Sequence, residues 1–168
     1  QSASAPYATD FARLAEIGRE GVFALLSDSS NSESSALIAS ENQTAEEVYD
    51  TIRYWDGRII VASVASNIQR VQQVLDAASK SGRKVTITGK DAEQIVQTAI
   101  RLGKLTLPEE DLLVSEKEMK KMDADKILIL ETGRMGEPLQ SLQKMASRRH
   151  RSVRIEEGDL VYITTTPS

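Results

Sequence analysis

The chain has 168 residues, with 21 Lys+Arg against 25 Asp+Glu, so its formal net charge is −4. Its residues are 40% hydrophobic but only 4% aromatic, which excludes a disordered chain and predicts a mainly aliphatic core. This length is typical of one globular domain, and no apolar run approaches the roughly 20 residues that a membrane-spanning helix needs.

The chain has no Cys and one His. This excludes disulfides, zinc–thiolate sites and a multi-histidine metal centre within the chain, and it predicts a reducing, cytoplasmic compartment. Any catalysis by the chain alone would have to use carboxylates, hydroxyls and backbone amides.

Both ends of the chain are expected to be truncations of a longer protein. Residues 1–10 contain no initiator Met and no secretory signal pattern, so we expect an artificial or disordered lead there. The sequence stops just past the strand-like run Leu160–Thr164, so we expect a truncation at the carboxyl end too.

Five short apolar runs predict β-strands, and most of them are continuous rather than alternating. Continuous runs are typical of parallel strands that helices cover on both faces. The runs are Val22–Leu26, Arg58–Ser63, Lys84–Thr88, Lys126–Leu130 and Leu160–Thr164.

Amphipathic stretches between these runs predict helices. Thr44-Ala-Glu-Glu47 and Ser66-Asn-Ile-Gln69 both have capping-box spacing, so Thr44 and Ser66 are expected to begin helices. Asp91 is expected to cap the next helix, and Pro138 occupies a first-turn position in the last one. The polar stretch Thr106–Lys121 is interpreted as a loop with a minor strand or helix.

Strands that alternate with helices predict an α/β fold: a three-layer, mainly parallel, Rossmann-like sheet with helices on both faces. Ligands bind such sheets outside the carboxyl ends of the strands. The segments expected at these ends are rich in hydroxyls and glycines, which favours anion binding through backbone amides. They are Ser27–Asn31, Ala65–Asn67, Thr88–Asp91, Thr132–Gly136 and Thr164–Thr166.

Two of these segments are candidate phosphate sites. The amides of Thr132–Glu137 could hold a phosphate with Arg134 as a charged clamp. The alternative is an ordinary strand-to-helix turn that needs a glycine at positive φ, because neither GxxxxGK[ST] nor GxGxxG is present. Ser66 and Asn67 could contact a phosphate or a ribose, or they could only cap a helix.

Two carboxylates and one basic cluster complete the candidates. Asp28, among serines after a strand, could ligate a metal or could be an ordinary loop residue. Glu41 could be a first-turn acid favoured by the helix dipole. The cluster Arg148-Arg-His-Arg151 could contact RNA phosphates, or it could be a solvated helix end. The net charge argues against a dedicated nucleic-acid binder, although the acids concentrate elsewhere.

Several sequence blocks stand in an order and spacing shared by one family, over nearly the whole chain from about residue 10. They are Asp10–Gly18, Leu25–Glu33, Gly57–Ile68, Gly82–Val85, Glu131–Pro138 and Glu157–Asp159. Together they resemble the bacterial ribonuclease J family. The resemblance implies a hydrolase of the metallo-β-lactamase superfamily, with an inserted β-CASP domain that clamps RNA and with two zinc or manganese ions that activate water.

The resemblance also assigns roles by position. Asp28 corresponds to a metal-bridging aspartate, and Glu41 to the catalytic acidic residue of the first β-CASP motif. The RNA-binding or phosphate-binding positions are Ser66, Asn67, Thr132, Gly133, Arg134, Thr165 and Thr166. Residues 11–40 are expected to be a piece of the flanking metallo-β-lactamase domain, and 41–168 a β-CASP domain truncated at its carboxyl end.

Three departures from the family pattern resemble the second, weakly active paralogue of Gram-positive bacteria: Val64, Gln69 and the pair Arg134-Met135. We expect the fragment to be inactive and to bind no metal alone, since one Asp cannot hold two ions. RNA and a paralogous ribonuclease J subunit are the expected partners, in a homo- or hetero-oligomer and away from membranes. The alternatives are a non-catalytic RNA-binding or partner subunit and an unrelated Rossmann-like nucleotide-binding domain.

Overall fold

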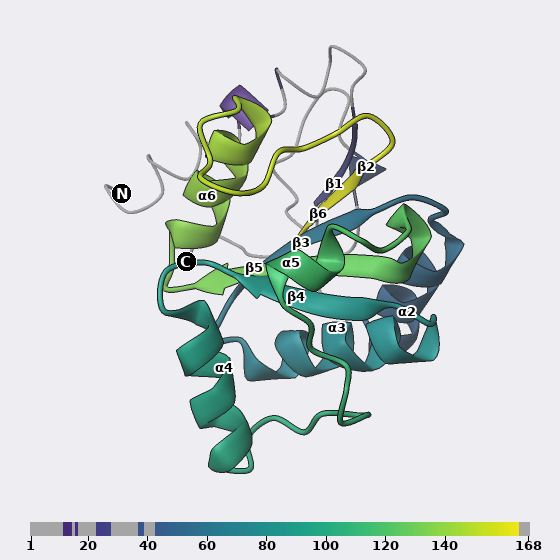
Figure 1. Cartoon of the computed structure of the whole chain (residues 1–168), viewed down its shortest axis with the longest axis vertical. Helices are drawn as coiled ribbons and strands as arrows, with labels where there is room; N and C mark the ends of the chain where they lie inside the picture. Colours follow the sequence, from purple (N-terminus) through teal and green to yellow (C-terminus); the bar gives the residue numbers. More distant parts are fainter. Residues whose placement is uncertain (1–11, 15, 17–22, 28–36, 39–42, 165–168) are drawn as a thin grey trace.

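The computed structural model describes residues 12–14, 16, 23–27, 37–38 and 43–164. They form an α/β fold in three layers, as predicted (Figure 1). The sheet has six strands that all pair in parallel, in the order β2-β1-β6-β3-β5-β4. The strands are β1 (Ala24–Ser27), β2 (Leu37–Ile38), β3 (Ile59–Val64), β4 (Lys84–Thr88), β5 (Ile127–Gly133) and β6 (Leu160–Ile163).

All five predicted runs form strands, because each supplies enough apolar side chains to be covered on both faces. Two details differ from the prediction. β5 continues through Glu131 and Thr132 to Gly133, which makes a carboxylate part of a buried strand. β2 was not predicted, because Leu37 and Ile38 are too few residues to produce a pattern.

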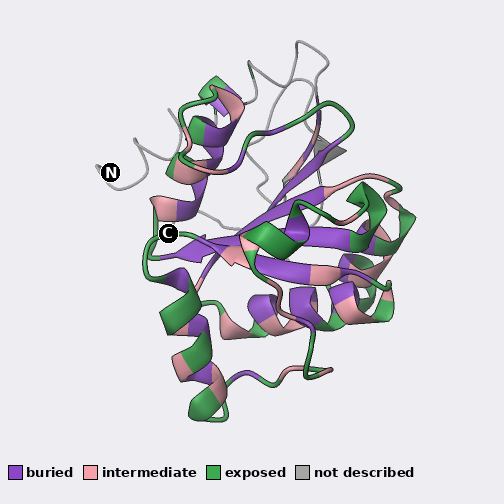
Figure 2. Ribbon diagram, in the orientation of Figure 1, coloured by how far each residue is buried: buried purple, intermediate pink, exposed green. Residues whose placement is uncertain are grey.

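Helices cover both faces of the sheet, and the strands between them are almost wholly buried (Figure 2). One apolar cluster packs α2 (Ala45–Tyr54), α3 (Ile68–Lys80) and α4 (Ala92–Arg101) on one face. A second cluster packs α5 (Glu116–Met119) and α6 (Glu137–Ala146) on the other. A short 3-10 turn, Ala124–Lys126, leads into β5.

The helix starts follow the sequence signals with one correction. Thr44 caps α2 as predicted, because its side chain accepts a hydrogen bond from the Glu47 amide at 3.2 Å. The cap of α3 is Asn67, whose Oδ1 accepts from the Arg70 amide at 3.2 Å, so the prediction of Ser66 was wrong by one residue. Asp91 is the N-cap residue of α4, as predicted, but it has φ 57 and its side chain makes no cap hydrogen bond. Pro138 lies in the first turn of α6.

β1 shows how far the sheet extends along the sequence. It lies before residue 40, yet Leu26 pairs with Tyr162 of β6, and β6 in turn pairs with β3. The sheet therefore includes residues on both sides of the boundary expected near residue 40, and the division into two domains remains a prediction. Among the helices that the structure describes, none combines the length and the apolar character needed to cross a bilayer.

Charged side chains bind backbone groups at the end of the sheet where the strands begin, which we call its amino-terminal edge. Arg83 is buried, and its guanidinium donates to the carbonyls of Trp55 at 2.6 Å, Gly57 at 2.8 Å and Ile127 at 3.0 Å. Burial lowers the pKa of Arg83. Arg58, just before β3, pairs with Asp159, just before β6, at 2.7 Å. These contacts join the chain segments that enter four neighbouring strands, β6, β3, β5 and β4.

Candidate nucleic-acid interface

The carboxyl ends of the central strands lie side by side at one end of the sheet, which we call its carboxyl edge. The Ala65 amide, after β3, donates to the Gly133 carbonyl at the end of β5 at 2.8 Å. The Thr164 amide, after β6, donates to the Ala62 carbonyl at 2.9 Å. These bonds bring together three of the segments that the sequence placed at this edge.

Gly89, after β4, brings the fourth segment to this edge. A Cβ on Gly89 would lie 2.1 Å from the Thr132 carbonyl oxygen and 2.7 Å from Oε2 of Glu131. Its φ is +124, in the region that favours glycine. Only glycine therefore allows the segment that carries Lys90 to lie against the end of β5.

The turn after β5 binds a carboxylate from its own chain. The Arg134 amide donates to Oε1 of Glu137 at 2.8 Å, and the Glu137 amide donates to the Arg134 carbonyl at 3.0 Å. Gly136 has φ +91, as an ordinary strand-to-helix turn requires. The expectation that the Arg134 amide is open to a phosphate was therefore wrong, because the Glu137 carboxylate already accepts from it. The Arg134 guanidinium is exposed.

Ser66 and Asn67 lie beside this turn, and both are exposed. Asn67 uses its Oδ1 for the cap of α3, which leaves its side-chain amide as a donor. Ser66 makes no side-chain hydrogen bond among the residues that the structure describes. A hydroxyl and an amide are therefore available next to an arginine, a combination that suits a sugar–phosphate chain.

Thr132 and Gly133, which the resemblance assigns to RNA or phosphate binding, lie deep at the end of β5. Both are buried, and the Gly133 carbonyl is already bonded to Ala65. Ser63 pairs with Thr132 across β3 and β5, and the hydroxyls of both are buried without a hydrogen-bond partner in the described part of the chain. These two hydroxyls lie below the interface rather than on it.

Glu131 is a buried carboxylate that the sequence reasoning did not single out. It is fully buried in β5, and its Oε1 accepts from the Thr88 hydroxyl at 2.9 Å. Burial raises its pKa to about 7, against the opposing effect of hydrogen bonds from Thr88 and Ser141. An acid directly after the apolar run Ile127–Leu130 was the available signal.

Several predicted residues lie outside the described residues: Asp28, Glu41, Thr165 and Thr166. Within the described part, no three His, Cys, Asp or Glu side chains are grouped as a metal site would require. His150 is at the opposite edge of the sheet, and its Nδ1 accepts from the amides of Ser152 at 3.2 Å and Val153 at 3.0 Å. The described residues therefore do not fit a two-metal centre.

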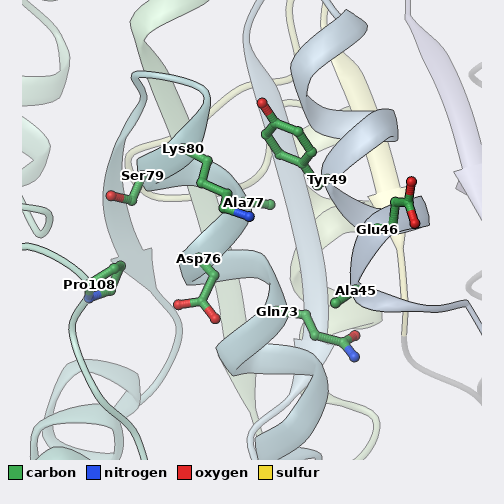
Figure 3. Close-up of a pocket in the computed structure, with 9 residues that line it drawn as sticks. All are labelled: Ala45, Glu46, Tyr49, Gln73, Asp76, Ala77, Ser79, Lys80 and Pro108. Carbon is green, nitrogen blue, oxygen red and sulfur yellow. The ribbon is translucent and has the colours of Figure 1, made fainter.

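A separate open pocket of about 570 Å³ lies on the outer side of α2 and α3 (Figure 3). Glu46 and Tyr49 line it from α2, and Asp76 and Lys80 line it from α3. The Lys80 ammonium lies 5.3 Å from the centre of the Tyr49 ring, so the cation is already stabilised by an aromatic face. This pocket shares no residue with the strand-end interface.

Comparison with known proteins gives one consistent result. Residues 56–168 match the family model described as ribonuclease J, beta-CASP domain. The chain is 58% identical over 168 residues to ribonuclease J 2 of Streptococcus pyogenes, covering 100% of this chain and 30% of that protein. It is 40% identical over 158 residues to ribonuclease J2 of Bacillus subtilis, covering 94% of this chain and 28% of that protein. It is 40% identical over 168 residues to ribonuclease J 2 of Staphylococcus aureus, covering 100% and 30%.

Proposed function

Because the chain belongs to the family of ribonuclease J β-CASP domains, we propose that it is the RNA-clamping region of a metal-dependent ribonuclease J that acts in cytoplasmic RNA processing and decay. The chain spans about 30% of the length of its Streptococcus relative, so the activity of the whole protein is part of this proposal. The observation that carries the proposal is that the segments of Asn67, Lys90 and Arg134 all lie at the carboxyl edge of the sheet.

The chemistry of that edge suits a sugar–phosphate chain. Lys90 and Arg134 are exposed cations, and neither has an ion pair among the described residues. Phosphate contacts from such side chains supply most of the sequence-independent affinity for nucleic acids. Ser66 and Asn67 add hydrogen-bonding groups that can contact a ribose or a phosphate oxygen.

RNA binding by variants of this edge tests the proposal. In fluorescence anisotropy with labelled oligouridine, Lys90→Ala with Arg134→Ala should weaken binding about 10-fold. The slope of log affinity against log salt should fall by about one for each phosphate that the variant no longer binds. A matched control is Arg101→Ala with Lys104→Ala, at the far end of α4. Equal weakening in the two double variants would contradict the proposed interface.

Catalysis requires metal ligands, and the proposal assigns one of them to Asp28, with Glu41 as the catalytic acid. When bound, two zinc or manganese ions would activate water for attack on a phosphodiester. We propose that the chain alone binds no metal and is inactive, because one Asp cannot hold two ions. RNA cleavage in proportion to chain concentration with added Mn²⁺ or Zn²⁺, abolished by Asp28→Ala, would overturn this.

A second candidate role is that of a non-catalytic partner subunit. The observation that favours it is the turn at Arg134 and Met135, where the departure from the family pattern lies on an exposed surface and Met135 is 55% exposed. Purified paralogous ribonuclease J is the probe. Retention of the paralogue by the chain without any RNA affinity would support this role against RNA clamping, and Met135→Ser should then weaken retention.

A further inference from the structure

A second cationic surface lies at the opposite edge of the sheet, where β3 and β6 begin. An open pocket of about 430 Å³ is formed there by the end of α5 and by segment 150–156. This segment belongs to the yellow-green loop that leads from α6 to β6 in Figure 1. Four of the lining side chains are cations and one is a carboxylate: Arg58, Lys120, Arg151, Arg154 and Glu156.

The pocket is held in shape by hydrogen bonds between its own walls. Asp159 accepts from Arg58 at 2.7 Å and from the Glu156 amide at 2.7 Å, so Arg58 is neutralised and serves the structure. The Nδ1 atom of His150 accepts from two successive backbone amides, which fixes the turn before Arg154. The Ser152 hydroxyl ties the same turn to Glu116 of α5 at 3.2 Å.

Three cationic side chains of the pocket form no ion pair that would stabilise the described part of the fold. Lys120, Arg151 and Arg154 are exposed, and none forms an ion pair with any residue that the structure describes. Because Nδ1 of His150 is an acceptor, its neutral ring carries the proton on Nε2 and is a further donor. The result is a preformed site with several donors and an excess of positive charge, in a chain whose net charge is −4.

The segment that lines the pocket folds back onto the end of α6. α6 ends at Ala146, where the His150 amide donates to the Lys144 carbonyl at 3.1 Å and the Ile155 amide donates to the Met145 carbonyl at 3.2 Å. Backbone amides therefore satisfy these carbonyls of the last turn, and the cations of the pocket are not needed as their partners.

We infer that this pocket binds phosphate groups of an RNA chain, as a second contact site at the amino-terminal edge of the sheet. The inference takes its ligand from the proposed function and therefore rests on it. β3 has six residues, so the two edges are about 20 Å apart, and one phosphate cannot contact both. The pocket thus extends the RNA path across the domain instead of repeating the first interface.

Charge reversal tests the inference. Arg151→Glu with Arg154→Glu should weaken binding of labelled oligouridine more than 10-fold and lower the salt slope by about two. The control, Arg101→Glu with Lys104→Glu, makes the same change of charge on exposed positions away from the pocket. Equal weakening by both pairs would overturn the inference. Arg154→Ala provides a milder variant, and circular dichroism checks that each protein is folded.

Amide chemical shifts separate this inference from the proposed function. Titration of the isotope-labelled chain with unlabelled oligouridine should shift amides 150–154 and also the amides near Arg134. Shifts near Arg134 alone would overturn the pocket and leave the first interface intact. Shifts at 150–154 alone would support the pocket and overturn the carboxyl-edge interface, and the absence of shifts at both would overturn both.

Discussion

Backbone hydrogen bonds join the strands at both edges of the parallel sheet, but the two edges use their cationic side chains differently. At the amino-terminal edge, Arg83 and Arg58 bind backbone carbonyls and a buried carboxylate. At the carboxyl-terminal edge, backbone binds backbone, as in the bond from Ala65 to Gly133, and the cations Lys90 and Arg134 stay exposed. A charged group that supports the fold has used its hydrogen bonds, so ligand contacts at either edge fall to exposed cations without an ion pair in the described part of the chain: Lys90 and Arg134 at one edge, Arg151 and Arg154 at the other.

Among the substitutions that test this difference between the edges, Gly89→Ala is expected to lower the free energy of unfolding most. The added Cβ would lie 2.1 Å from the Thr132 carbonyl oxygen, and the φ of +124 adds strain. We expect unfolding in urea to show a loss of about 4 kcal/mol. Gly82→Ala is the control, since its φ is +77 but nothing lies within 4 Å. Gly82→Ala should lower the free energy of unfolding by only about 1 kcal/mol. Equal losses of stability in the two variants would show that close packing does not hold the carboxyl edge.

Arg83→Met tests the amino-terminal edge. Methionine keeps the apolar stem but leaves the carbonyls of Trp55, Gly57 and Ile127 without their donor. Buried carbonyls that lose a partner are costly, so the free energy of unfolding should fall by about 3 kcal/mol. The exposed Arg101→Met should change it little. A small loss for Arg83→Met would mean that this edge does not depend on its arginine.

Glu131→Gln is expected to have an effect that depends on pH. The folded-state pKa is raised from 4.5 to about 7, so the folded protein holds this proton more tightly than the unfolded chain. Stability is therefore lost as pH rises from about 4.5 through 7. The cost to the wild type reaches about 3 kcal/mol at pH 8, and glutamine removes it.

Urea unfolding at pH 5 and pH 8 measures this difference. The Glu131→Gln variant should be more stable than the wild type at pH 8 and nearly equal to it at pH 5. Glu93→Gln, on the exposed side of α4, is the control and should show no such change with pH. An effect of the same size at both pH values would contradict a buried, protonated carboxyl.

Asn67→Ala should have the smallest effect, and it tests which residue caps α3 at the carboxyl edge. It removes the Oδ1 acceptor that caps α3, so the free energy of unfolding should fall by about 1 kcal/mol. Ser66→Ala should have almost no effect on stability, because its hydroxyl is not the cap. If the two losses were reversed, the cap would be Ser66 as the capping-box pattern predicted.

The sequence predicted the fold well because its signals are local and strong. Val61 and Leu130 lie in continuous apolar runs, which are typical of strands buried on both faces. Leu37 and Ile38 gave no such signal, since two residues form no pattern. The choice between Ser66 and Asn67 failed because both are good caps, and tertiary contacts of the turn decide between them.

The site could be predicted only in part, because the burial of each residue and its hydrogen-bond partners depend on the assembled sheet. Arg134 and Asn67 were placed correctly at the strand ends, since the carboxyl ends of parallel strands meet at one edge. The bond from the Arg134 amide to Glu137 depends on the local path of the turn, which the residue types alone do not define. The burial of Thr132 and Glu131 follows from β5 being longer than its apolar run.

The position of β6 has a consequence for how the protein forms. β6, the last strand that the structure describes, lies between β1 and β3, so β1 has no neighbour on that side until β6 arrives. β3, β4 and β5 follow one another in the sequence with no other described strand between them, and they can assemble first. During synthesis, β1 must therefore wait until residues 160–163 have been made. Its docking is a late, long-range step, during which the exposed edge of β3 is open to incorrect pairing.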